Sequence, residues 1–135
     1  MKIYIAYRFS GADPKEVEEN LGKIFDALKT AGHEYICTFE RRDEYKERGV
    51  DSKEAFRNSL DAVDECDTTL AFIESDHKSE GMLLELGYAL AKEKNIILAV
   101  KEGVEVTDKY TPNQLIIFED IDNLANQLQS LQNAT

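Results

Sequence analysis

The chain has 135 residues, with 16 Lys or Arg against 27 Asp or Glu, so its formal net charge at pH 7 is −11. This length supports one domain over residues 1–135, and the 42% of hydrophobic residues argues against a disordered chain. The acidic balance disfavours nucleic acid and anionic membrane surfaces as partners, because both attract clustered Lys and Arg.

Segments with strand and helix patterns alternate along the chain. In chain order, the sequence predicts a strand at 2–7, a helix at 13–32, a strand at 33–39, a helix at 51–63, a strand at 68–73, a helix at 80–94, strands at 95–100 and 114–118, and a helix from 120. Two connections are predicted to be irregular, a charged loop at 40–50 and a loop of turn-forming residues at 101–113.

Capping residues mark the predicted helix starts. Asp13 precedes Pro14, a pair typical of a first helical turn, and Asp51 stands three residues before Glu54 as in a capping box. Asp120 is placed to cap the last helix. The helix boundaries therefore follow from local chemistry as well as from apolar periodicity.

Five strands alternating with four helices predict a single doubly wound α/β domain. This is a flavodoxin/Rossmann-like parallel five-stranded sheet with helices on both faces, and right-handed crossovers favour the strand order 2-1-3-4-5. Ligands bind such sheets at the carboxyl ends of the strands, near the switch between the first and third strands. The loops at 8–13 and 74–81 are therefore expected to lie side by side and to carry the function.

The two cysteines, Cys37 and Cys66, form no CxxC motif and are too few for a disulfide scaffold. The first residues resemble a strand and not a signal peptide, and every apolar run is far shorter than a membrane span of roughly 20 residues. These features favour a reduced, cytoplasmic protein.

Glu85 is a lone acidic residue within an apolar helical pattern. The residues one turn away are Gly81, Met82, Tyr88 and Ala89, and none of them forms a salt bridge with a carboxylate. Gly81 and Ala89 leave room on that side for a ligand to approach. A solvent-exposed helical glutamate is the alternative, and the pattern leaves both interpretations open.

The stretch around Glu85 resembles a known family. The run from Ser79 to Ala89 has the pattern SxGxxxExGYA and is similar to the signature of the nucleoside 2-deoxyribosyltransferase superfamily. It is most similar to the branch that includes the 2′-deoxynucleoside 5′-phosphate N-hydrolases. The opening run KIYIAYRFSG also resembles the first strand and loop of the family. The element order matches over most of the chain, and the specific motifs cover the first loop and residues 67–100.

The resemblance implies cleavage of the glycosidic bond of a nucleoside or its 5′-monophosphate, without a metal or cofactor. Glu85 matches the nucleophile, which attacks C1′ of the sugar and forms a glycosyl ester. Water then releases the sugar in a hydrolase, or a second base accepts it in a transferase. Tyr4 matches a tyrosine that orients this carboxylate, with an ordinary core tyrosine as the alternative.

Several residues are candidates for binding a 5′-phosphate. Ser79 matches a serine of the nucleotide hydrolases, where members acting on free nucleosides tend to have an Asp. Its hydroxyl and the backbone N–H groups around Gly81 would attract an anion at a helix N-terminus, whereas a plain N-cap is the alternative and Glu80 would repel phosphate. Three further candidates lie in the first loop: Arg8, Ser10 and Gly11.

One position departs from the family pattern. The family usually has a catalytic Asp eight residues ahead of the acid that opens the third strand, here matched by Asp67, and that position is Ser59. The nearby Asp61 and Asp64 are expected to point elsewhere on the helix. The sequence therefore leaves open whether the site cleaves its ligand or only binds it.

The sequence favours an N-glycosidase or deoxyribosyltransferase acting on a small-molecule nucleoside or nucleoside monophosphate. One alternative is a non-catalytic nucleotide-binding or sensing domain on the same scaffold, and another is a TIR-like domain that cleaves NAD or assembles. The resemblance also implies a homodimer or larger homo-oligomer. The apolar helix at 80–94 and the last helix are the expected pairing faces.

Overall fold

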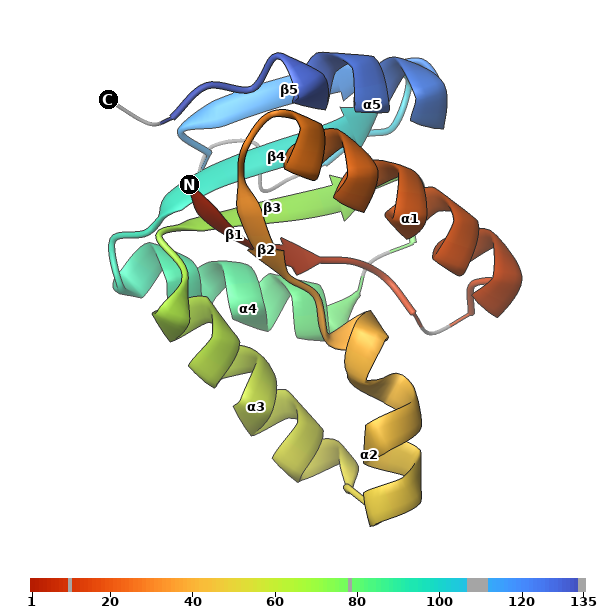
Figure 1. Ribbon diagram of the computed structural model, residues 1–135, viewed down its shortest axis with the longest axis vertical. Coiled ribbons are helices and arrows are strands. Elements are labelled where there is room, and N and C mark those ends of the chain that lie inside the picture. The colour runs from red at the N-terminus through yellow and green to blue at the C-terminus, as the bar shows by residue number, and fades with distance from the viewer. Residues whose placement is uncertain (10, 78, 107–111, 134–135) are drawn as a thin grey trace.

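The computed structural model describes residues 1–9, 11–77, 79–106 and 112–133. Five parallel strands form one sheet in the order β2–β1–β3–β4–β5 (Figure 1). The strands are β1 Lys2–Ala6, β2 Glu34–Ile36, β3 Thr68–Ile73, β4 Asn95–Lys101 and β5 Gln114–Phe118. The predicted fold class and strand order are confirmed.

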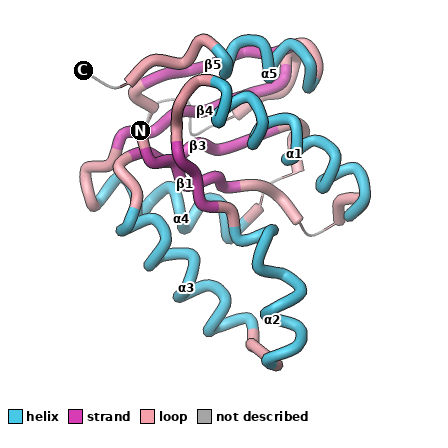
Figure 2. Tube along the Cα trace, viewed as in Figure 1, coloured by secondary structure: helices cyan, strands magenta, loops and turns pink. Residues whose placement is uncertain are grey.

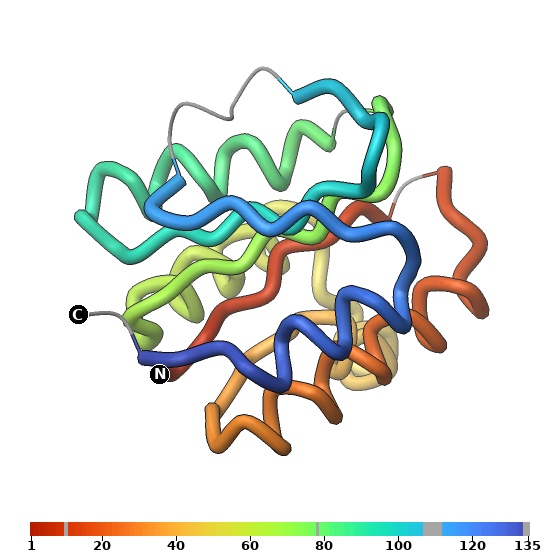
Figure 3. Tube along the Cα trace, turned by 90° about the horizontal axis from the view of Figure 1, so that it is seen from above, coloured from red at the N-terminus to blue at the C-terminus, as the bar shows by residue number. Residues whose placement is uncertain are grey.

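Helices cover both faces of the sheet. The helices are α1 Pro14–Thr30, α2 Arg42–Arg48, α3 Ser52–Glu65, α4 Glu80–Ala91 and α5 Ile121–Gln129, and a 3₁₀ turn, η1, spans Thr38–Arg41. Figure 2 shows α1 and α5 on one face and α3 and α4 on the other, and in the view from above in Figure 3, α1 and α5 lie on one side of the strands and α4 on the opposite side. Within the described ranges, no helix is long and apolar enough to cross a membrane.

Each face of the sheet has its own hydrophobic layer. Alternate residues of β1 show this, because Ile3 and Ile5 pack towards α1 and α5, whereas Tyr4 and Ala6 pack towards α3 and α4. The central strands β3 and β4 are buried on both sides, as their continuous apolar sequences predict. The layer that contains Tyr4 is the one that also supports the functional site.

The predicted helix caps are present. The side chains of Asp13, Asp51 and Asp120 accept hydrogen bonds from the backbone N–H groups of Lys15, Glu54 and Asn123. Each such cap is worth about 1 kcal/mol. Local sequence therefore fixes where α1, α3 and α5 begin.

The prediction of a charged loop at 40–50 is wrong, because this segment forms η1 and α2. The second strand is also shorter than predicted and ends at Ile36. The Arg42 guanidinium lies 4.0 Å from the centre of the Phe39 ring, and Gly49 ends α2 in the left-handed conformation with φ 65°. These contacts give helical order to a segment whose composition suggested a solvated loop. The predicted loop at 101–113 falls partly outside the described residues.

Candidate active site

A pocket of about 490 Å³ opens at the carboxyl ends of β1 and β2, beside the N-terminal turns of α4. Its lining residues are Tyr4, Tyr7, Arg8, Phe9, Thr38, Ser79, Glu80, Gly81, Met82 and Glu85. This is the switch region between the first and third strands, where parallel α/β sheets bind ligands. The structure thus brings together the first loop and the α4 turn that the sequence singled out.

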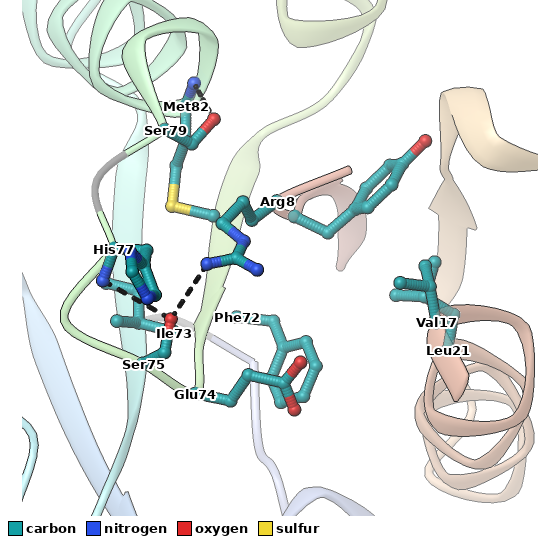
Figure 4. A pocket seen from close by; sticks show the side chains of 11 residues that line it. Arg8, Val17, Leu21, Phe72, Ile73, Glu74, Ser75, His77, Ser79 and Met82 are labelled. Carbon is teal, nitrogen blue, oxygen red and sulfur yellow. Dashed lines mark hydrogen bonds between the residues drawn. The ribbon is translucent and has the colours of Figure 1, made fainter. Parts of the chain in front are cut away.

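A second, narrower pocket of about 30 Å³ shares Tyr7, Arg8, Ser79 and Met82 with the first (Figure 4). The Arg8 guanidinium reaches across this space and donates a hydrogen bond from Nη1 to the Ser75 hydroxyl at 3.1 Å. Arg8 is therefore held by the loop that follows β3. The alternative interpretation, in which Arg8 is a freely solvated loop cation, does not include this hydrogen bond to Ser75.

Glu85 is buried, with 8% of its surface exposed, so the alternative of a solvent-exposed helical glutamate is wrong. The Tyr4 hydroxyl donates a hydrogen bond to Oε2 of Glu85. None of the ion pairs among the described residues includes this carboxylate. Burial raises the pKa of Glu85, and hydrogen bonds from Tyr4 and Ser59 act in the opposite direction by stabilising the charged form.

Tyr4 lies on β1 with 1% of its surface exposed. Burial is the main cause that raises the pKa of its phenol, and the adjacent Glu85 carboxylate raises it further. The phenol therefore keeps its proton and acts as a donor to the carboxylate. Tyr4 is buried in the core, as the alternative interpretation predicted, and its hydroxyl also donates a hydrogen bond to Glu85.

Tyr7, Phe9 and Thr38 line the pocket and are among the residues that the sequence interpretation did not name as candidates. Tyr7 follows β1 directly, and its pKa is raised chiefly by burial, whereas hydrogen bonding to Thr38 lowers it. The Tyr7 ring meets the Phe39 ring edge-on, with 5.7 Å between the ring centres. The signal for Thr38 was its place just after the second strand, whose carboxyl end also borders the switch region.

Ser79 both caps α4 and lines the pocket. Its hydroxyl accepts a hydrogen bond from the Met82 backbone N–H at 3.2 Å, which is the N-cap geometry of the alternative interpretation. Gly81 and Glu80 border the same opening. Gly11 adopts a left-handed φ of 76° beside Arg8 and is outside the pocket lining, and Ser10 lies outside the described residues.

Ser59 is the position at which the sequence departs from the family pattern. In the structure it lies on α3 near the Glu85 carboxylate. It is buried, and its hydroxyl donates to the Ala55 carbonyl at 3.2 Å. Asp61 is exposed, and Asp64 accepts a hydrogen bond from the Tyr88 hydroxyl at 2.7 Å on the protein surface. As expected, these two carboxylates point away from Glu85. No group of three His, Cys, Asp or Glu in the described ranges is placed to hold a metal ion.

The chain belongs to the nucleoside 2-deoxyribosyltransferase family, whose sequence model matches residues 3–126. Among curated proteins, no sequence matches. Together with the fold and the buried carboxylate in the pocket, the family match supports an enzyme that processes nucleosides as an N-glycosidase or deoxyribosyltransferase.

Solved structures of related enzymes share the fold. A CMP N-glycosidase from Clostridium botulinum is 19% identical with a TM-score of 0.71, covering 97% of this chain and 100% of that one. A 2-deoxyribosyltransferase from Bacillus psychrosaccharolyticus is 21% identical with a TM-score of 0.72, covering 98% and 93%. A 2-deoxyribosyltransferase from Leishmania mexicana is 16% identical with a TM-score of 0.64, covering 97% and 99%.

Glu85→Gln is expected to raise the free energy of unfolding at neutral pH. Because the folded-state pKa of Glu85 is raised, the unfolded chain loses this proton at a lower pH than the folded chain does. The stability linked to the protonated carboxyl is therefore lost as pH rises through the folded-state pKa. Gln keeps an acceptor for Tyr4 and has no proton to lose.

Urea unfolding between about pH 4 and pH 8 measures this difference. The stability gain of Glu85→Gln should be smallest at the acidic end, grow with pH and then level off. Glu19→Gln, an exposed change on α1, is the matched control and should show no such growth. A gain for Glu85→Gln that stays constant over the whole range would contradict the role given to burial.

Proposed function

We propose that the chain cleaves the glycosidic bond of a nucleoside or nucleoside 5′-monophosphate with Glu85 as the nucleophile. The observation that carries this proposal is a buried carboxylate that borders the pocket and accepts a hydrogen bond from the Tyr4 hydroxyl. Family membership supports the class of reaction. The related Clostridium botulinum structure is a CMP N-glycosidase, which supports a nucleoside monophosphate as one candidate substrate.

The reaction proceeds in two displacements. A carboxylate oxygen of Glu85 forms a bond to C1′ of the sugar while the C1′–N bond breaks, and its electron pair leaves with the base, which takes up a proton from solvent. A water oxygen then attacks C1′ of the glycosyl ester, loses a proton and returns Glu85 to the carboxylate. In a transferase, the nitrogen of a second base replaces water in this step.

Tyr4 orients the nucleophile in this scheme. Because its pKa is raised, the phenol remains protonated and keeps donating to Oε2 of Glu85. The same bond stabilises the ionised carboxylate, which burial disfavours. Tyr4 therefore helps to keep Glu85 in the charged form that attacks.

A 5′-phosphate would bind at the mouth of the pocket. Arg8 is the cation among the lining residues, and the N-terminus of α4 adds the Ser79 hydroxyl and the backbone N–H groups near Gly81. Gly11, which lies beside Arg8 in the first loop, is a further proposed donor through its backbone, and Ser10 of the same loop lies outside the described residues. Glu80 opposes phosphate binding by charge, so the local donors must outweigh it.

A second candidate function is nucleotide binding without cleavage. The observation that favours it is Ser59, which stands where the family pattern usually has a carboxylate. A buried hydroxyl does not replace an acid in proton transfer at neutral pH. The two candidate functions differ in whether base is released.

Free base should appear when the protein is incubated with a panel of ribo- and deoxynucleosides and their monophosphates, followed by chromatography. Glu85→Ala should lower kcat by at least about a thousandfold because covalent catalysis is lost, and Glu85→Gln should do the same. Glu19→Gln should leave the rate unchanged. Exchange of one base for another without net hydrolysis identifies a transferase.

Two outcomes would contradict this proposal. If no substrate releases base while one of them binds tightly, the protein is a binding domain. If base release survives Glu85→Ala, Glu85 is not the nucleophile.

Arg8→Ala is expected to lower kcat/KM for the 5′-monophosphate by about 10- to 100-fold, because a charge-assisted hydrogen bond to phosphate is lost. The value for the corresponding free nucleoside should change little. Steady-state kinetics on the matched pair measure the two effects. Lys23→Ala removes a cation on α1 that is paired with Asp122 and is the control. An equal loss on both substrates would argue against phosphate binding by Arg8.

We further propose a homodimer that pairs through α4. The exposed large hydrophobic residues of this helix are Leu83, Leu84 and Leu90. Leu84 and Leu90 lie three residues on either side of Gly87, so an antiparallel second copy brings Leu84 of one chain against Leu90 of the other. Between 81 and 91 the one charged residue is the buried Glu85, so two acidic chains meet there without like-charge contact. The apolar residues of α5 that are buried, Leu124 and Leu128, pack on the sheet instead.

The state of the two cysteines indicates the kind of cellular compartment in which the protein functions. Cys37 and Cys66 are both free and buried, and burial raises the pKa of each thiol. Unpaired structural thiols are usual in a reducing compartment. We therefore propose a cytoplasmic location.

Leu84→Asp is expected to convert the dimer to a monomer, because it places two carboxylates in an apolar contact. Size-exclusion chromatography with light scattering measures the mass in solution. Asn126→Asp adds the same charge on the exposed side of α5 and should leave the dimer intact. If Asn126→Asp dissociates the protein and Leu84→Asp does not, pairing is through α5.

A further inference from the structure

Ser59 is a polar residue on the buried side of α3. It is 7% exposed, and its neighbours on this side, Ala62 and Val63, belong to the hydrophobic layer that contains Tyr4 and Leu86. Helix α3 packs against both β1 and α4, the elements that carry Tyr4 and Glu85. The Ser59 hydroxyl therefore faces the layer in which the site carboxylate is held.

The Ser59 hydroxyl has one proton and more than one acceptor. It donates to the Ala55 carbonyl one helical turn away at 3.2 Å, a common bond for a serine inside a helix. The same hydroxyl lies beside the Tyr4 phenol and the Glu85 carboxylate, and its hydrogen bonding lowers the pKa of both. Because the proton reaches one acceptor at a time, donation to the carboxylate requires the hydroxyl to turn away from the Ala55 carbonyl.

The other titratable groups near Glu85 form no ion pair with it among the described residues. Arg8 lines the same pocket, but its guanidinium donates to Ser75. Tyr4 reaches Glu85 from β1, and the carboxylate raises the pKa of Tyr7, which follows β1, and of Cys37, which follows β2. A phenol and a thiol that burial keeps protonated do not neutralise a carboxylate. In the described structure, the ionised form of Glu85 is therefore stabilised by the hydroxyl groups of Tyr4 and Ser59.

We propose that Ser59 is a positioning residue that holds the Glu85 carboxylate together with Tyr4. A single bond from Tyr4 leaves the carboxylate free to rotate about its last torsion angle, and a second donor from α3 fixes that rotation. When Glu85 becomes an ester in the proposed reaction, the Ser59 proton returns to the Ala55 carbonyl. The Ser59 hydroxyl then keeps an acceptor at every stage. The catalytic value of this arrangement rests on the proposed function.

The test measures the pKa of Glu85 directly, by carbon-13 NMR titration of its side-chain carboxyl, with the signal assigned by its loss in Glu85→Gln. Ser59→Ala removes the donor and should raise the pKa of Glu85 by about one pH unit, as loss of a hydrogen bond to a charged group requires. Ser59→Thr keeps a hydroxyl and should restore the wild-type value. Ser52→Ala, on the exposed start of α3, should leave it unchanged.

Kinetics give a second readout. In Ser59→Ala, the acidic limb of the kcat/KM profile should move to higher pH by the same amount, with kcat lowered about tenfold and KM unchanged. An unchanged pKa of Glu85 in folded Ser59→Ala would overturn the inference, even if the variant is less stable. Should Ser59→Ala not fold, Ser59→Cys, a weak donor of similar volume, provides the same comparison. If the wild-type protein releases no base, the proposed function fails, and the titration still decides the role of Ser59.

Discussion

The hydrogen bond between Tyr4 and Glu85 is the contact on which the site depends. It joins β1 to α4 and places a donor against a buried carboxylate that borders both the pocket and an apolar layer. A buried charge costs several kcal/mol unless polar groups compensate it, so neither partner is free to vary alone. The stability of this layer of the protein is thereby tied to the protonation of one side chain.

The parallel sheet makes this contact possible. In the order β2–β1–β3–β4–β5, β1 and β3 are neighbours, and α4 follows β3 across the face that Tyr4 points to. A tyrosine early in the chain and a glutamate 81 positions later therefore meet without any loop having to reach between them. Arg8 follows β1 and Ser75 follows β3. The hydrogen bond between their side chains therefore joins the ends of the same two neighbouring strands, nearer to the solvent.

Much of the fold was predictable because its signals are local. The strand at Thr68–Ile73 is an apolar run between acidic residues, and the structure reproduces its limits. The helical segment Arg42–Arg48 was missed because its position depends on tertiary contacts, such as Phe39 against Tyr7 and Arg42 against Glu18. Within the site, Glu85 stood out by its lack of a charged neighbour in sequence. Thr38 was not named as a site residue, and Ser59 was noted only as a departure from the family pattern, because their contacts depend on where β2 ends and on which way α3 faces.

The segment from Thr38 to Arg48 contributes Thr38 to the pocket lining yet takes no part in the sheet. Phe39 anchors it by packing against Tyr7 and Phe9, and Gly49 separates it from α3. Insertions or deletions in this segment would leave the strand register untouched. Over evolutionary time, relatives with this scaffold are free to diverge in the molecules they accept by remodelling this segment, while the carboxylate and its hydroxyl partners stay where the sheet puts them.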